Sequence, residues 1–197
     1  EPRFLEAAEN IKKYLLNGLR SPGGAFFTSQ DADVNEAMPG KAYYALSQSE
    51  RDALSAKPRI DMHIYARENG WAIRGLAAYF SATGDTAALD AAKSAAEWIA
   101  KNRKLEGGGY THGEADRGGP FLGDTLAMGQ AALELYAASG DRKWMSLASE
   151  AGDFIAAKFQ DSAGGLLTSA QSEANTGVFT TPAKIPEEQI QTARFAN

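Results

Sequence analysis

The chain of 197 residues contains no cysteine. This absence excludes disulfide bonds, zinc sites with thiolate ligands and catalysis by a thiol nucleophile within the chain. It leaves open whether the compartment is reducing or oxidising. Only two histidines are present, His63 and His112, and neither HxH nor HxxxH spacing occurs. The sequence therefore predicts no zinc site, and nothing in it indicates a cofactor.

Long apolar runs and clusters of basic residues are also absent. No apolar stretch approaches the roughly 18 residues that a membrane-spanning helix needs, so we expect no membrane partner. The net charge is −5, and no run of Lys and Arg exceeds three residues. Nucleic acid is therefore not an expected partner. With 44% hydrophobic and 23% charged residues, the composition is that of an ordinary globular protein.

An internal repeat organises the chain. The stretch from Gly70 to Tyr110 matches the stretch from Thr125 to Leu166 at a shift of 56 positions, which places Gly84-Asp85 on Gly140-Asp141. At a shift of 140, "FLEAAENIKKYLLNGLRSPGGAFFTS" matches "WMSLASEAGDFIAAKFQDSAGGLLTS". Each unit consists of a first helix, a Gly-Asp turn and a second helix. Glycine permits the positive φ that ends one helix, and aspartate caps the next.

The connections between the units predict the architecture. Turns within a unit are short, whereas the connections between units span 20–66, 104–123 and 160–187. Because the helical hairpins alternate in direction, all of the long connections emerge on one face, which we expect to be the functional face. We predict an all-α fold of helical-hairpin repeats that forms part of an (α/α)6 toroid, with short β-hairpins in the long loops. We expect residues 1–197 to form one domain that is a fragment of a larger toroid. The expected helices cover residues 2–18, 69–83, 86–103, 125–139 and 142–159.

Carboxylates recur at the starts of the first helices. Glu68 and Asp124 coincide at the shift of 56, and Glu188 takes the same place before "QIQTARFAN". One interpretation is structural, because acids at helix N-termini bond backbone N–H groups and complement the helix dipole. The other is functional: a rim of acids that binds polyols or acts as general acid and base.

The stretch "QDADVNEAMPG" places Asp31 and Asp33 in a D-x-D-x-N pattern that begins like a calcium loop. The sixth position should be Gly but is Glu36, and the twelfth should be Glu but is Ala42, so we predict no calcium site. We expect a β-hairpin with arms "GAFFTSQ" and "KAYYAL" and an acidic tip at residues 31–40. The tip is either a solvated turn or a loop that faces a substrate.

The other candidate residues lie in or beside the long connections. His63 and His112 are either structural loop residues or acid–base groups. Trp71 is either a core residue or a platform on which a sugar stacks, and Arg67 and Arg117 suit loop salt bridges better than an anion clamp. The candidate catalytic residues are Asp31, Asp33, Glu68, His112 and Asp124. The candidate substrate-binding residues are Tyr44, His63, Arg67, Asn69, Trp71, Tyr110 and Phe121.

Several of these stretches resemble one protein family. "GGAFFTSQDAD…GKAYYAL", "ENGWAIRGLAAYFSATGD" and "GPFLGDTLAMGQAALELYAASGDRKWM" are similar, in this order, to segments of the spermatogenesis-associated protein 20 family. The likeness covers nearly the whole chain. It departs near "DMHIYARENG", where His63 and Glu68 replace the lysine and the tryptophan that are frequent in the family. The resemblance implies a six-hairpin glycosidase-like toroid joined, in the full-length protein, to a thioredoxin-like domain.

Two functions follow as hypotheses. In the first, the toroid binds or processes a carbohydrate, as a glycosidase or an epimerase does, and its ligand is a sugar or polyol. In the second, it is a non-catalytic scaffold that serves the thioredoxin-like partner domain. The sequence does not decide whether the domain is an enzyme. A partial toroid also exposes the apolar flanks of its terminal hairpins, so a homodimer through these flanks is a further possibility.

Overall fold

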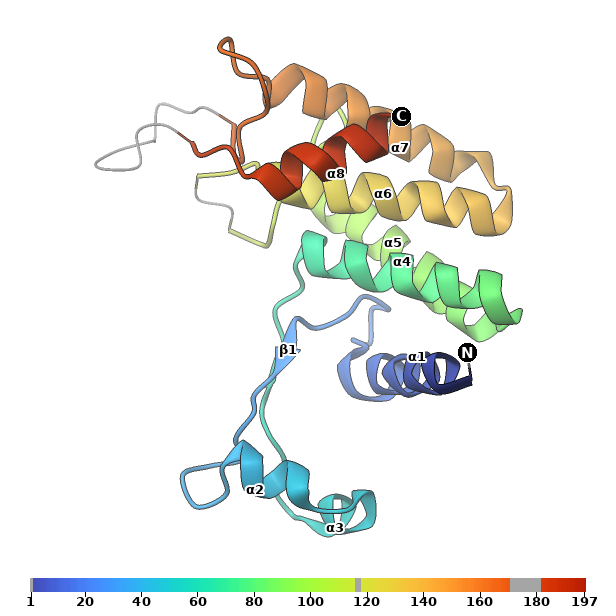
Figure 1. The fold of residues 1–197 in the computed structure, drawn as a ribbon, viewed down its shortest axis with the longest axis vertical. Coiled ribbons are helices and arrows are strands. Elements are labelled where there is room, and N and C mark those ends of the chain that lie inside the picture. Colours follow the sequence, from blue (N-terminus) through green and yellow to red (C-terminus); the bar gives the residue numbers. More distant parts are fainter. Residues whose placement is uncertain (1, 116–117, 171–181) are drawn as a thin grey trace.

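The computed structural model describes residues 2–115, 118–170 and 182–197 (Figure 1). The predicted all-α class is confirmed. Arg117 and residues 171–181 of the last long connection lie outside the described residues. The helices are α1 (Pro2–Tyr14), continued by the π-helical segment η1 (Leu15–Leu19), α2 (Gly40–Ala45), α3 (Gln48–Ala53), α4 (Ala66–Thr83), α5 (Thr86–Arg103), α6 (Leu122–Ser139), α7 (Arg142–Lys158) and α8 (Pro186–Ala196). No helix in this part of the chain combines the length and apolarity needed to cross a membrane.

Two complete helical hairpins form the centre of the fold. Gly84 ends α4 with φ +74°, and the Asp85 carboxylate caps α5 by accepting hydrogen bonds from two backbone N–H groups. Gly140 ends α6 with φ +69°, and Asp141 caps α7. Both predicted Gly-Asp turns are therefore confirmed, because the signals that specify them are local.

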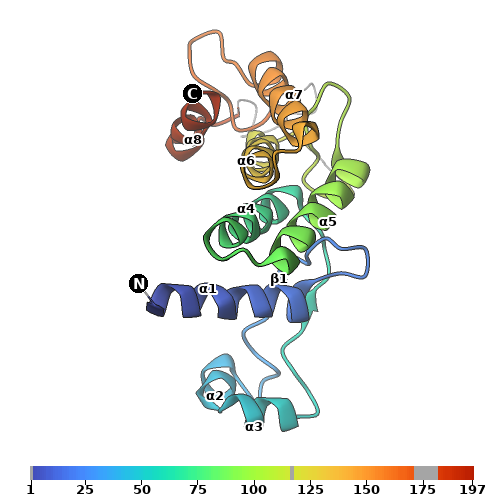
Figure 2. The ribbon, with the colours of Figure 1, turned by 90° about the vertical axis from the view of Figure 1, so that its right-hand side faces the viewer.

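The helices are arranged in two layers. We call the first helix of each unit inner (α4, α6, α8) and the second helix outer (α1, α5, α7). α6 packs against α4, α7 and α8, and Figure 2 shows α5 and α7 on one side of the inner helices. Small side chains allow the close approach: the buried face of α5 consists largely of alanine. The starts of the inner helices lie at one end of the hairpins and the Gly-Asp turns at the other (Figure 1).

A tight β-turn structure follows every outer helix. Each contains one antiparallel bridge, and the three bridges are Arg20 to Phe26, Lys104 to Tyr110 and Gln160 to Leu166. Their spacing reproduces the shifts of the sequence repeat. A glycine with positive φ lies at the same place in each turn: Gly24, Gly108 and Gly164. The predicted short β-hairpins between the units are thus present, in reduced form.

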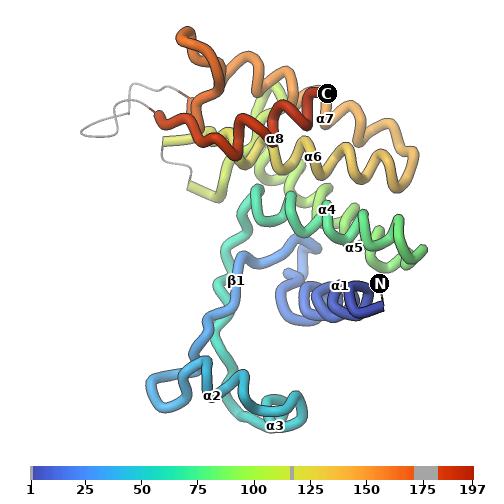
Figure 3. Tube along the Cα trace, in the orientation of Figure 1, coloured from blue at the N-terminus to red at the C-terminus, as the bar shows by residue number. Residues whose placement is uncertain are grey.

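The predicted hairpin between "GAFFTSQ" and "KAYYAL" is wrong. The second segment forms α2, because the Asp33 carboxylate accepts a hydrogen bond from the Gly40 N–H at 2.5 Å and Pro39 provides the extended residue before the helix. The strand β1 (Ser29–Gln30) instead pairs antiparallel with β2 (Ile60–Asp61). Residues 31–59 therefore form an excursion that carries α2 and α3 away from the other helices at the end of a two-stranded ribbon (Figure 3).

The inner helices begin earlier than predicted. α4 starts at Ala66 and α6 at Leu122, three residues before the predicted starts. Glu68 and Asp124 are consequently the third residues of their helices, and Glu188 is the third residue of α8. The predicted equivalence of the three acids holds, although none of them is the first helical residue.

Candidate functional site

The starts of the three inner helices lack their own side-chain caps. The residues that precede them, Tyr65, Phe121 and Ile185, are extended and none of them bonds a helix N–H through its side chain. Carboxylates at the third helical position lie beside these open N-termini, where the helix dipole favours negative charge.

Asp124 caps a neighbouring helix rather than its own. Its Oδ1 accepts a hydrogen bond at 2.9 Å from the backbone N–H of Arg67, the second residue of α4. The same oxygen lies 2.9 Å from Nδ1 of His112. Asp124 is only 2% exposed. Burial raises the pKa of the Asp124 carboxyl, and the bonds from His112 and Arg67 oppose this increase.

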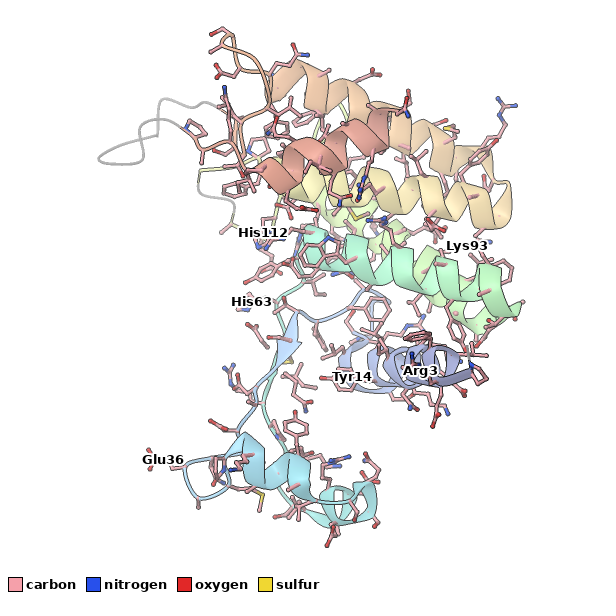
Figure 4. All side chains as sticks on the ribbon, viewed as in Figure 1. Arg3, Tyr14, Glu36, His63, Lys93 and His112 are labelled. Carbon is pink, nitrogen blue, oxygen red and sulfur yellow. The ribbon has the colours of Figure 1, made fainter. Side chains whose placement is uncertain are left out.

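Aromatic rings stack above this carboxylate. Tyr65 and His112 are nearly parallel with ring centroids 4.2 Å apart, and His63 also stacks on Tyr65, at 5.7 Å. Phe121 meets His112 edge to face at 6.4 Å. Figure 4 shows both histidines near the point where the chain enters α4. The exposed His63 also lies 2.5 Å from the Asp61 carboxylate, and this hydrogen bond lowers the pKa of Asp61.

Arg67 lies between two further carboxylates. Its guanidinium donates to Glu68 Oε1 at 3.0 Å. Burial raises the pKa of Glu188, and a hydrogen bond from Thr168 and the charge of Arg67 oppose this increase. Gly123 makes room for this arrangement, because a Cβ there would lie 3.1 Å from Glu188 Oε1 and 3.4 Å from Arg67 Cδ. The Oε2 atoms of Glu68 and Glu188 are buried without a hydrogen-bond partner among the described residues.

A cavity of about 480 Å³ lies between α4, α6 and α8, and Arg67 and Glu188 contribute to its lining. Trp71 lines it and is 54% exposed, so the interpretation of Trp71 as a core residue is wrong. The Arg67 guanidinium lies 5.2 Å from the centre of the Trp71 ring. Arg74 donates to Gln130 at 2.7 Å across the cavity wall. Glu187, Gln191 and Arg194 of α8 complete the polar lining.

Sequence reasoning missed Arg74, Gln130, Glu187, Gln191 and Arg194. One signal was available on α4: Arg67, Trp71 and Arg74 are spaced four and three residues apart and therefore share one face of the helix. Glu187, Gln191 and Arg194 have the same spacing and share one face of α8, whereas no such signal marked Gln130 on α6.

The side chains of Asn69 and Tyr110 are buried inside the fold. The fully buried Asn69 accepts from the Phe26 N–H at 2.8 Å and donates to the carbonyl groups of Phe26 and Tyr65, both at 2.9 Å. Tyr110 is also buried, and its burial raises the pKa of the phenol to about 12. As substrate-binding residues, both remain untested predictions.

Asp31, Asp33 and Tyr44 are not brought together with Asp124. Asp31 forms a surface ion pair with Arg59 at 3.1 Å. Asp33 caps α2, and Tyr44 belongs to that helix. Among residues 2–115, 118–170 and 182–197, no group of three or more His, Asp or Glu side chains is placed to hold a metal ion.

Solved structures share this arrangement. A family 76 glycoside hydrolase (mannosidase) from Bacteroides thetaiotaomicron superposes with a TM-score of 0.64 and 17% identity over 100% of this chain and 48% of its own. The cellobiose 2-epimerase from Spirochaeta thermophila superposes with a TM-score of 0.63 and 19% identity, over 93% of this chain and 43% of its own. A possible family 105 glycoside hydrolase from Salmonella enterica superposes with a TM-score of 0.65 and 14% identity, over 100% of this chain and 51% of its own.

The chain folds as part of an α/α toroid. It spans about half the length of these neighbours. At this level of identity the likeness concerns the fold alone. No protein-family model and no curated protein sequence matches the chain.

Proposed function

We propose that the cavity between α4, α6 and α8 is a carbohydrate-binding site, and that the acids at the helix starts beside it process the bound sugar. The observation that carries the proposal is the half-exposed Trp71 ring in a cavity whose other walls are largely charged or amide side chains. The C–H face of a sugar stacks on such a ring, while carboxylates and amides bind its hydroxyl groups. The toroid neighbours include a mannosidase and a cellobiose epimerase, which supports the same class of ligand.

The chemistry we propose uses Glu188 and Glu68. Glu188 has a raised pKa, which favours its protonated form as a proton donor, and Glu68, which accepts a hydrogen bond from Arg67, offers a second carboxylate. Each has one oxygen that is buried without a hydrogen-bond partner among the described residues, so neither carboxylate is fully satisfied within the fold. Asp124 fixes the ring orientation of His112, which gives a second acid–base group for an epimerase-like reaction.

A second candidate function is a scaffold that serves a thioredoxin-like domain in the full-length protein, as the family resemblance implies. The observation that favours it is the aromatic stack of Tyr65, His112 and Phe121, which packs above Asp124 as a structural cluster would. In that case, the cavity beside Trp71 binds no sugar.

Isothermal titration calorimetry with a set of mono- and disaccharides tests the proposal. We expect at least one sugar to bind, and Trp71→Ala to weaken its binding tenfold or more, which corresponds to about 1.4 kcal/mol. Tyr44→Ala is the matched control, because Tyr44 is equally exposed but belongs to α2 in the excursion. Equal losses for both variants, or no binding of any sugar, would favour the scaffold.

A further inference from the structure

A chain of hydrogen bonds crosses one wall of the cavity beside Trp71 and joins its three helices. The guanidinium of Arg74 on α4 donates to Gln130 Oε1 on α6 at 2.7 Å. Gln130 Nε2 in turn donates to the side-chain oxygen of Gln191 on α8 at 3.4 Å, and Gln191 donates to Glu187 Oε1 at 2.8 Å. All four side chains line the cavity. The network therefore holds the guanidinium of Arg74 in one orientation at the cavity wall.

This network orients the charge of Arg74 without neutralising it. The acceptor on Gln130 is a neutral amide, and the bond uses one of the five N–H donors of a guanidinium. Arg67 differs, because two of its N–H groups donate to the Glu68 carboxylate, at 3.1 and 3.0 Å. Glu134 lines a second hollow of about 290 Å³ that Arg74 also borders, but no ion pair joins the two in the described part of the chain. Arg74 thus retains donors and positive charge for a ligand.

Arg74 lies one helical turn from the ring on which a sugar would stack. Trp71 and Arg74 are three residues apart, so their side chains share one face of α4, and both line the cavity. One turn is about 5.4 Å, which is comparable with the width of a sugar ring. A substituent at the edge of a ring stacked on Trp71 can therefore reach the guanidinium. Arg74 is partly buried, and bonds to a charged group strengthen where water is partly excluded.

The cavity is richer in positive than in negative side chains, although the chain as a whole is acidic. Its lining contains three arginines, Arg67, Arg74 and Arg194, and two glutamates, Glu187 and Glu188. Burial raises the pKa of Glu188 and favours its neutral form, which increases the positive excess. The net charge of the chain is −5, so an attraction for anions here is local to the cavity.

We propose that the sugar bound beside Trp71 is a uronic acid, whose carboxylate accepts hydrogen bonds from Arg74, while Arg194 adds positive charge from α8. This inference rests on the proposed carbohydrate site and narrows its ligand to an acidic sugar. A planar guanidinium matches the two oxygens of a carboxylate and can bind both through parallel N–H groups. A neutral sugar has a hydroxymethyl group in place of the carboxylate and gives the guanidinium no counter-charge.

Isothermal titration calorimetry with matched sugars tests this inference. The acidic probes are D-glucuronate and D-galacturonate, and the neutral probes are D-glucose, D-galactose and glucuronamide, the uncharged amide of the first. We expect at least one uronate to bind tenfold or more tightly than its neutral counterparts. The preference should shrink as the salt concentration rises, because it depends on charge.

Substitutions of arginine by glutamine identify the group responsible. Arg74→Gln removes the charge but keeps a side chain that can bond Gln130, and we expect it to abolish the preference for uronate. Arg194→Gln replaces an exposed side chain, so it leaves the core intact and should lower the affinity for uronate by a smaller factor. Arg142→Gln is the matched control, because it removes the same charge from the exposed start of α7, at the other end of the hairpins, and should keep the full preference.

The outcomes separate this inference from the proposed function. Neutral sugars that bind as tightly as the uronates, and lose affinity in Trp71→Ala, would overturn the uronate ligand and leave the carbohydrate site standing. A preference that survives in both Arg74→Gln and Arg194→Gln, or that Arg142→Gln loses equally, would also overturn it. If none of the sugars binds, the proposed function fails and the inference fails with it.

Discussion

The Asp124 carboxylate accepts a hydrogen bond from the backbone N–H of Arg67, 2.9 Å away in the neighbouring inner helix. Arg67 occupies the second position of α4, where an N–H has no partner within its own helix. Asp124 therefore satisfies the start of α4 from α6 and fixes the relative height of the two helices. Asp124, which the sequence suggested as a cap of its own helix, instead caps the first helix of the preceding unit.

This relationship predicts how substitutions at Asp124 rank in stability. Asp124→Ala leaves the Arg67 N–H of a partly buried hydrogen bond without an acceptor and should lower the free energy of unfolding by about 1–3 kcal/mol. Asp124→Asn keeps an oxygen acceptor and should cost less than half as much. Urea denaturation of both variants measures the difference. If Asp124→Ala is as stable as the wild type, the bond between the helices is unimportant.

The raised pKa of Glu188 predicts a pH dependence with a definite sign. Because the folded-state pKa lies above the ordinary value of 4.5, the folded protein favours the neutral carboxyl. The stabilising contribution is complete below that value and is lost as the pH rises through the folded-state pKa. Glu188→Gln stays neutral, so its stability relative to wild type should increase across this window. Denaturation series at several pH values test this, and a difference that falls with pH would contradict it.

Asn69 is predicted to matter for stability. Its side chain makes three hydrogen bonds at 2.8–2.9 Å, two of them to Phe26, and it is completely buried. Asn69→Ala should cost about 2–4 kcal/mol, because buried backbone groups of Phe26 and Tyr65 lose their partner. Thermal or chemical denaturation measures this. A variant that melts like the wild type but loses ligand affinity would instead establish Asn69 as a substrate-binding residue.

Two glycines on the inner helices should respond to alanine in opposite ways. Gly75 lies mid-helix, and no atom comes within 4 Å of the place that an alanine methyl group would take, so Gly75→Ala should stabilise the protein by about 0.5–1 kcal/mol. Gly123→Ala would crowd Glu188 and Arg67, and should forfeit this gain and weaken sugar binding. Parallel denaturation and calorimetry compare the two. Equal stabilisation and unchanged affinity for both would show that Glu188 and Arg67 are not held at the site by the space at Gly123.

The architecture could be predicted because its determinants are local and repeated. Gly84-Asp85 and Gly140-Asp141 specify turns within a few residues, and the shifts of 56 and 140 located the equivalent helices. The prediction of a strand at "KAYYAL" was wrong. Its two tyrosines favour a strand, but the Asp33 carboxylate, seven residues before Gly40, caps a helix there. That contact depends on the path of the loop.

The candidate site could be predicted only in part. The equivalence of Glu68, Asp124 and Glu188 follows from the repeat, but their partners do not, because Arg67 reaches Asp124 through its backbone. The exposure of Trp71 depends on which side of α4 faces the cavity, and an inner helix has neighbours on several sides. Gln130 and Gln191 come from different units and meet only in the folded chain.

The most direct test of a carbohydrate site beside Trp71 is a proton–nitrogen NMR titration that follows the tryptophan indole signals. The chain contains only three tryptophans, and their environments differ, since Trp71 is 54% exposed and Trp144 only 1%. The site predicts that a sugar shifts the Trp71 signal, assigned through Trp71→Phe, and leaves the Trp144 signal in place. A sugar that binds without shifting the Trp71 indole signal would contradict a carbohydrate site beside Trp71.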